Sequence, residues 1–97
     1  MLIIKILSLG APERYAVRRL VTAVQHELQT VNPQLQMTIS EVDDAGQIGR
    51  YASFLVMPTL VINEKVVCSG RFPTREEVTR WLREAAKQTQ DGGADVE

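Results

Sequence analysis

Thiol and imidazole side chains are almost absent from this sequence, which has one cysteine, Cys68, and one histidine, His26, among 97 residues. A single cysteine cannot form a disulfide within the chain, and it rules out iron–sulfur and multi-cysteine zinc sites. One histidine leaves little for metal binding or for general-base catalysis. Most residue combinations that enzymes use are therefore missing, and we expect neither a metal ion nor a cofactor.

The sequence also lacks a surplus of charge and a long apolar run. Eleven basic and twelve acidic residues give a formal net charge of −1, which argues against binding to nucleic acid or to an anionic membrane. The longest uninterrupted apolar stretch, 54–58, is far shorter than the ~20 residues of a membrane-spanning helix. No secretory signal follows the N-terminus, so we expect a cytoplasmic protein whose thiol stays reduced.

The first third of the chain predicts a buried strand and a long helix. Residues 2–7 are apolar at almost every position, as in a strand covered on both faces. Pro12 suits the first position of a helix, which would make Ala11 the N-cap, and Asn32-Pro33 ends that helix. One apolar stripe runs along it, formed by Val17, Leu20, Val21, Val24, Leu28 and Val31.

A second strand and a weaker helix come next. Residues 36–42 alternate between apolar and polar side chains, which is typical of a strand near the edge of a sheet. A capping box that begins at Asp44 predicts a short helix, which two glycines weaken. One face of the strand carries Met37, Ile39 and Glu41.

The remaining chain predicts a hairpin and a third helix. Two β-branched runs, 59–62 and 65–69, flank a two-residue turn whose second residue, Glu64, stands where glycine is favoured. Thr74 begins a helix with a capping box. The helix would bury Val78, Trp81, Leu82 and Ala85, and the polar segment 88–97 has the composition of a disordered tail.

The order of these elements is β-α-β-α-β-β-α within one domain, residues 1–87. A parallel βαβ unit followed by an antiparallel hairpin predicts an α/β fold, with a mixed four-stranded sheet and helices on both faces. The core should contain residues from every long element. We expect the following to be largely buried: Ile4, Ile6, Leu20, Val24, Leu28, Leu60, Ile62 and Trp81.

Three segments resemble the thioredoxin fold, and in particular the small glutaredoxin-like or thioredoxin-like redox-active disulfide proteins. Residues 51–59 resemble the stretch that leads through a cis-proline into a strand, here Met57-Pro58-Thr59. Residues 58–67 resemble the strand–turn–strand of that family, and Gly70-Arg71 with the Thr74 helix resembles its ending. The resemblance spans residues 2 to about 86 and implies a cis bond between Met57 and Pro58.

The sequence departs from this family at the redox site. Such proteins carry C-x-x-C at the start of the first helix, where this chain has Ala11-Pro12-Glu13-Arg14. Thiol–disulfide exchange needs one thiolate to attack and a second thiol to resolve the mixed disulfide. Neither Ala11 nor Arg14 can perform these steps, so we expect no dithiol oxidoreductase activity.

The peptide-binding edge of the family does not depend on the cysteines. Its backbone before the cis-proline pairs with an extended peptide, and the first helix adds unpaired N–H groups and a positive dipole end. We therefore expect a non-catalytic protein that binds a protein or peptide. The candidate binding residues are Ala11, Pro12, Glu13, Arg14, Met57, Pro58 and Thr59.

Two alternatives remain open. Cys68 could act in a one-cysteine or glutathione-linked redox protein. A free cysteine on a strand is more often a small buried residue, and Cys68 would share its strand face with Val66. The chain could also be a structural subunit that associates with itself through its helix faces. Several basic residues could gather at the candidate edge and bind an acidic group, namely Arg14, Arg18, Arg19, Arg50 and Arg71.

Overall fold

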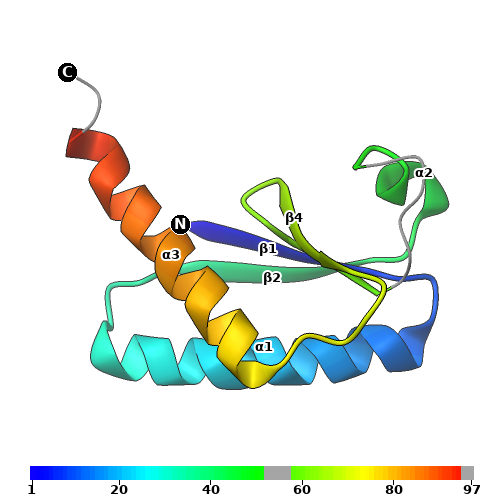
Figure 1. Cartoon of the computed structure of the whole chain (residues 1–97), viewed down its shortest axis with the longest axis horizontal. Coiled ribbons are helices and arrows are strands. Elements are labelled where there is room, and N and C mark those ends of the chain that lie inside the picture. Colours follow the sequence, from blue (N-terminus) through cyan, green and yellow to red (C-terminus); the bar gives the residue numbers. More distant parts are fainter. Residues whose placement is uncertain (52–57, 95–97) are drawn as a thin grey trace.

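The computed structural model describes residues 1–51 and 58–94, and its elements follow the predicted order (Figure 1). The elements are β1 (Leu2–Leu7), α1 (Ala11–Val31), β2 (Met37–Val42), α2 (Ala45–Ile48), β3 (Thr59–Ile62), β4 (Lys65–Ser69) and α3 (Arg75–Ala94).

The four strands form one mixed sheet in the order β2-β1-β3-β4. β1 runs parallel to β2 and antiparallel to β3, and β3 pairs with β4 in an antiparallel hairpin. The doubly apolar β1 therefore lies inside the sheet, as its sequence predicted. Leu7, the last residue of β1, pairs with Val42 on one side and with Thr59 on the other.

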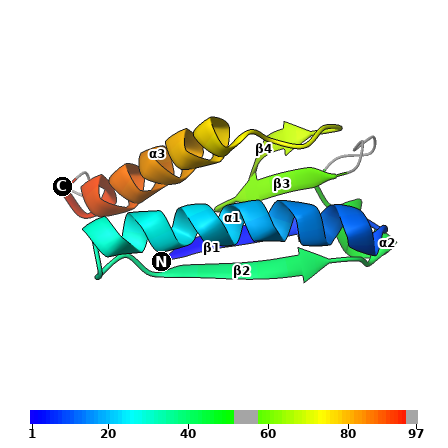
Figure 2. The same ribbon diagram turned by 90° about the horizontal axis from the view of Figure 1, so that it is seen from below.

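Helices cover both faces of the sheet, which confirms the predicted layers. α1 and α3 lie side by side on one face, and the single turn of α2 lies on the other (Figures 1 and 2). The main core fills the space between the sheet and the two long helices. Its buried residues are Leu2, Ile4, Ile6, Val17, Val21, Val24, Leu60, Ile62, Cys68, Val78, Leu82 and Ala85.

A small second cluster lies under α2 and consists of Leu7, Ile48 and Val61. α2 stays short because Gly46 and Gly49 are poor helix formers. Its N-cap is Asp44, as predicted, but the Asp44 carboxylate accepts a hydrogen bond from the Gly46 amide at 2.8 Å.

The apolar stripe of α1 is turned slightly from its predicted position. Val17, Val21 and Val24 are its buried residues, whereas Leu20 and Leu28 are only partly buried at the margins of the main core. Trp81 of α3 is also only partly buried. The expectation that Leu20, Leu28 and Trp81 are largely buried was therefore wrong. The faces of the two helices that contact the core centre on other residues: Val17, Val21 and Val24 in α1 and Val78, Leu82 and Ala85 in α3.

The hairpin has the predicted two-residue turn. Asn63 and Glu64 have φ values of 51° and 67°, so both adopt the left-handed conformation of a type I′ turn. The Asn63 side-chain oxygen accepts a hydrogen bond from the Ile3 amide at 2.9 Å. Glu64 forms an ion pair with Lys5 at 2.7 Å and accepts a hydrogen bond from the Tyr51 hydroxyl. These bonds hold a residue other than glycine at the strained turn position.

The hairpin also contains a β-bulge that the sequence pattern did not reveal. Leu60 pairs with Cys68, but Val61 pairs with Val66, so Val67 is the extra residue. Because a bulge breaks the alternation of side chains, Cys68 packs in the main core while Val66 packs against the cluster under α2. The expectation that Cys68 shares a face with Val66 was therefore wrong.

α3 begins with the predicted capping box. The Thr74 amide donates to the Glu77 carboxylate at 3.0 Å, and the Glu77 amide donates to the Thr74 hydroxyl at 3.1 Å. The helix extends to Ala94, past Gln88, where the polar segment begins. Adding residues to an existing helix costs little compared with nucleating one, and polar residues allow it to continue.

None of the helices in the described ranges is both long enough and apolar enough to cross a membrane.

Candidate functional site

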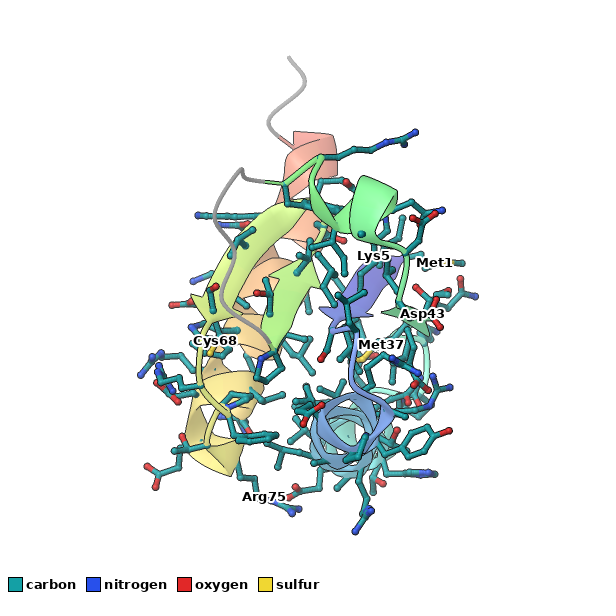
Figure 3. The ribbon with its side chains drawn as sticks, turned by 90° about the vertical axis from the view of Figure 1, so that its right-hand side faces the viewer. Met1, Lys5, Met37, Asp43, Cys68 and Arg75 are labelled. Carbon is teal, nitrogen blue, oxygen red and sulfur yellow. The ribbon has the colours of Figure 1, made fainter. Side chains whose placement is uncertain are left out.

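The candidate edge lies where β1 ends, α1 begins and β3 starts. The pairing of Leu7 with Thr59 brings Ser8, the residue after β1, level with Pro58. The Gly70 amide donates to the Pro58 carbonyl at 3.0 Å, which extends the row to the end of β4. Figure 3 views the molecule from this end, with Cys68 on the side of α3 and Asp43 on the opposite side. Ser8, Pro58 and Gly70 thus form the floor of the edge.

The N-cap of α1 is Gly10, one residue before the position that we expected. Ala11 is consequently the first helical residue and Pro12 the second, where the missing N–H of proline still costs nothing. The cap has no side-chain hydrogen bond. The Gly10 amide instead donates to the Ser8 hydroxyl at 3.2 Å.

Glu13 lies over the helix start. A methyl group on Gly10 would overlap the Glu13 carboxylate, so this side chain folds back along the first turn towards the cap. Its negative charge interacts favourably with the positive end of the helix dipole. The chain's own carboxylate therefore occupies the place where an incoming anion would bind, which argues against an anion site at this helix end.

Arg14 stands where the sequence resemblance placed the second cysteine of the C-x-x-C motif. Its side chain is only 12% exposed. Nε lies 3.2 Å from a Glu41 carboxylate oxygen, and an Nη1 hydrogen is donated to the Ser8 carbonyl at 2.9 Å. Asp43 lies 3.9 Å from Nη2. Arg14 thus joins the first turn of α1 to the carboxyl ends of both β1 and β2.

Arg18 completes this ion cluster. It lies one turn after Arg14 and donates to the second oxygen of Glu41 at 3.1 Å, so that Glu41 bridges two guanidinium groups. The sequence placed Arg14 and Arg18 on one helix face but did not identify Glu41 as their partner. The sequence did contain a signal for this partner: Glu41 is an acidic residue on the same strand face as Met37 and Ile39, and that face packs against α1.

The other predicted arginines do not join this cluster. Arg71 forms a bidentate ion pair with Glu77, with both N–O distances at 2.7 Å. In the described part of the chain, Arg19 and Arg50 form no ion pair that brings them to the edge. The expected gathering of five arginines is therefore limited to Arg14 and Arg18.

The proline side of the edge is only partly described. Pro58 and Thr59 are buried, and the Thr59 and Ser69 hydroxyls lie 3.1 Å apart. The Pro58 carbonyl accepts a hydrogen bond from the Gly70 amide, and proline has no backbone N–H to donate. Met57, and with it the expected cis Met57–Pro58 bond, lies outside the described residues.

Cys68 lies in the main core beneath α3 and is 6% exposed. Its thiol lies 3.5 Å from the Arg71 carbonyl oxygen, to which it donates. Burial raises the pKa of the Cys68 thiol, against a smaller opposite effect of the Arg71 charge. A raised pKa leaves less thiolate, which is the reactive form.

Three large apolar side chains are exposed on segments at this end of the sheet. Leu9 is 63% exposed, Tyr15 56% and Phe72 54%. Leu9 follows Ser8 in the loop before α1, Tyr15 lies in the second turn of α1, and Phe72 follows the Gly70 turn after β4. Sequence analysis missed all three, because isolated apolar residues outside a periodic pattern give no sign of their exposure.

The described residues contain no group of three or more histidine, cysteine, aspartate or glutamate side chains that could hold a metal ion. The edge therefore offers an ion cluster, a capped helix start and exposed apolar side chains. None of its described side chains is a thiol.

Residues 3–83 match a family model described as the thioredoxin domain. No curated protein and no solved structure matches the chain significantly.

Proposed function

Because the chain belongs to the thioredoxin-domain family, we propose that it is a non-catalytic member that binds a protein or an extended peptide. The binding surface in this proposal is the edge formed by the start of α1, Pro58 and the loop after β4. The proposal rests mainly on Arg14, whose position in the family belongs to a thiol and is here occupied by a largely buried ion cluster.

The ion cluster supports the absence of redox chemistry at the edge. A disulfide needs two thiols whose Cα atoms lie within about 7 Å. Ala11 and Arg14 provide no thiol, and Cys68 is the single cysteine of the chain. Arg14 instead stabilises the β1–α1 connection through the Ser8 carbonyl. The arrangement therefore keeps the shape of this end of the fold without its reactive groups.

The exposed side chains of Leu9, Tyr15 and Phe72 support binding. When a partner covers an apolar side chain that is more than half exposed, apolar surface is removed from water, and this favours binding. Aromatic residues are also enriched at protein interfaces. Leu9 follows Ser8 in the chain and Phe72 comes two residues after Gly70, so each lies near one end of the row formed by Ser8, Pro58 and Gly70. A peptide that crosses this row would contact apolar side chains at both sides.

The competing one-cysteine redox function has less support. It requires Cys68 to be accessible and at least partly ionised, yet the thiol is buried and its pKa is raised. Native-state labelling with a thiol reagent separates the two functions. Labelling should be slow in native buffer and fast in denaturant, whereas fast native labelling would favour the redox function.

The binding proposal can be tested with a library of extended peptides displayed on phage and selected on the immobilised chain. We expect selected peptides to lose binding to the Leu9→Glu and Phe72→Glu variants, because a charge at either side of the row would be desolvated on binding. Val31→Glu is the matched control, since Val31 is 85% exposed at the far end of α1.

Two outcomes would overturn the proposal. One is a failure to select any peptide on the folded wild-type chain. The other is a set of peptides that bind all three glutamate variants as tightly as the wild type. Circular dichroism of each variant establishes that it is folded before binding is compared.

A further inference from the structure

The two edges of the sheet differ in how they are protected. β4 carries Lys65 and the Val67 bulge, both of which discourage pairing with another strand. β2 pairs with β1 through six residues without a register shift, and it contains neither lysine nor proline. Figure 2 shows β2 along the outer margin of the sheet. Among the described residues, no strand pairs with its outer side.

The backbone of β2 presents three residues outwards. The Leu2 amide donates to the Gln36 carbonyl and the Ser8 amide donates to the Val42 carbonyl. In a parallel ladder, alternate residues bond the neighbouring strand, so Thr38 and Ser40 also face β1. The N–H and C=O groups of Met37, Ile39 and Glu41 consequently point away from the sheet.

We propose that two copies of this chain pair through β2, antiparallel and around a two-fold axis at Ile39. Ile39 would face its own symmetry mate, and Met37 would face Glu41 of the other copy. Thr38 would face Ser40. This register places no like charges directly opposite each other, whereas an axis at Glu41 would oppose two carboxylates and be unfavourable. The pairing is independent of the proposed peptide-binding edge.

The contacts of α1 place the helix symmetrically about the same axis. Glu41 lies level with the turn between Arg14 and Arg18, and Gln29 donates to the Leu35 carbonyl at 2.9 Å. Ile39 precedes Glu41 by two residues, which is about 7 Å along a strand. The same length corresponds to about four to five residues of helix. Because α1 runs antiparallel to β2, Ile39 lies level with roughly residue 20 or 21 of α1. This level is near the middle of the 11–31 helix.

The flank of α1 beside β2 is suited to face its own copy. Arg18, Thr22, Gln25 and Gln29 follow one another at intervals of three or four residues, so they lie on one side of the helix. The Arg18 charge is already paired with Glu41, and the other three side chains are uncharged. A shallow hollow of about 510 Å³ adjoins this flank at Arg18 and Thr22, and its other lining residues are Tyr15, Arg19, Ala23 and His26. An antiparallel α1 from the second copy would meet Thr22 close to the axis.

Disulfide trapping tests the register. We would mix equal amounts of Thr38→Cys and Ser40→Cys variants under mild oxidation. In a non-hydrogen-bonded antiparallel pair the two Cα atoms lie about 4.5 Å apart, within disulfide range. The mixture should form a cross-linked dimer on a non-reducing gel. Each variant alone should cross-link much less, because diagonal positions lie roughly 7–8 Å apart. The native Cys68 is buried and should not contribute.

Sedimentation velocity of the full chain over a concentration series tests the assembly without cysteine substitutions. The wild type should shift from monomer to dimer, and Thr22→Arg should raise the dissociation constant about tenfold or more because it adds a charge and bulk near the axis. Thr30→Arg makes the same change at an exposed position on another side of α1, and it should leave the dissociation constant unchanged.

The proposal fails if the wild type remains monomeric at the highest soluble concentration. It also fails if Thr22→Arg and Thr30→Arg change the dissociation constant equally. Cross-linking of each single variant at the rate of the mixture would place the axis elsewhere and overturn the Ile39 register.

Discussion

Arg14 and Glu41 illustrate how single residues can change the chemistry of an edge while its architecture is retained. The resemblance drawn from the sequence implies thiols in the first turn of this helix. Here a guanidinium group binds a strand carbonyl and a carboxylate. Charge-assisted bonds of this kind are strong when they are shielded from water, and Arg14 is largely buried. The residue therefore contributes to the packing of α1 against β1 and β2 rather than to reactivity.

Glu77 should make the stability of the fold sensitive to acid. The bidentate bond from Arg71, followed by the Thr74 amide, lowers the pKa of the Glu77 carboxyl from 4.5 to about 2. Because the folded-state pKa is the lower one, the stabilisation is complete above pH 4.5 and is lost as the pH falls towards 2. Urea denaturation at a series of pH values should show Glu77→Gln to be less stable than wild type near neutrality and less sensitive to acid.

Glu76→Gln provides the control for that experiment. Glu76 is an exposed carboxylate at the adjacent position of the same helix turn, and its substitution changes the net charge by the same amount. If Glu76→Gln flattened the acid limb as much as Glu77→Gln, the pH dependence would come from net charge and not from the Arg71 contact.

The turn residue Glu64 combines backbone strain with a favourable contact. Its φ of 67° disfavours any residue other than glycine, asparagine or aspartate, while Lys5 and Tyr51 bind its carboxylate. Both Glu64→Ala and Glu64→Gly remove these bonds, but only glycine also removes the strain. The urea midpoint should therefore fall further for Glu64→Ala than for Glu64→Gly. Equal midpoints would mean that the turn relaxes without strain in the alanine variant.

At the scale of elements, burial decides which positions of the two long helices support the core. Leu82 of α3 is fully buried and Leu20 of α1 is only partly buried. Leu82→Ala should lower the free energy of unfolding by roughly 2–5 kcal/mol, since it leaves a cavity in the main core. Leu20→Ala should cost less. Chemical denaturation measures both, and an equal loss would mean that Leu20 lies deeper in the core than its exposure indicates.

The regular elements were predictable because their signals are local. The doubly apolar β1, the Thr74–Glu77 capping box and the hairpin turn each follow from the spacing of residue types. The bulge at Val67 was not predictable, because Val66, Val67 and Cys68 look alike in a β-branched run and only the pairing with Leu60 and Val61 distinguishes them. Leu20 was misplaced for a similar reason: a six-residue stripe defines a helix face only approximately.

The candidate site was harder to predict than the fold. Sequence pattern located the first turn of α1, and Arg14 was named there, but its bond to Glu41 joins residues that are 27 positions apart. The exposed side chains of Leu9 and Phe72 depend on how the loops leave the sheet. Such long-range properties need coordinates, and the Met57–Pro58 bond stays a prediction.

At the scale of the whole molecule, the chain has the fold of the thioredoxin-domain family and a single cysteine, Cys68. We therefore expect the wild type to reduce insulin with dithiothreitol no faster than its Cys68→Ser variant. A thiol pair placed at the start of α1 should change this, because a helix N-terminus lowers the pKa of a nearby thiol and favours thiolate attack.

The Ala11→Cys/Arg14→Cys double variant tests whether a thiol pair at the start of α1 is enough to give the chain disulfide reductase activity. It should gain dithiothreitol-dependent insulin reduction, whereas Ala11→Cys and Arg14→Cys alone should not, since neither can resolve a mixed disulfide. The double variant should also unfold at lower urea concentration than the wild type, because Glu41 retains only Arg18 as its partner. If circular dichroism shows the double variant to be folded and it still turns over no insulin, the start of α1 does not have the geometry of a redox site. The Glu13 carboxylate that lies over Gly10 would then be the first residue to replace, since its charge opposes a thiolate at the same helix end.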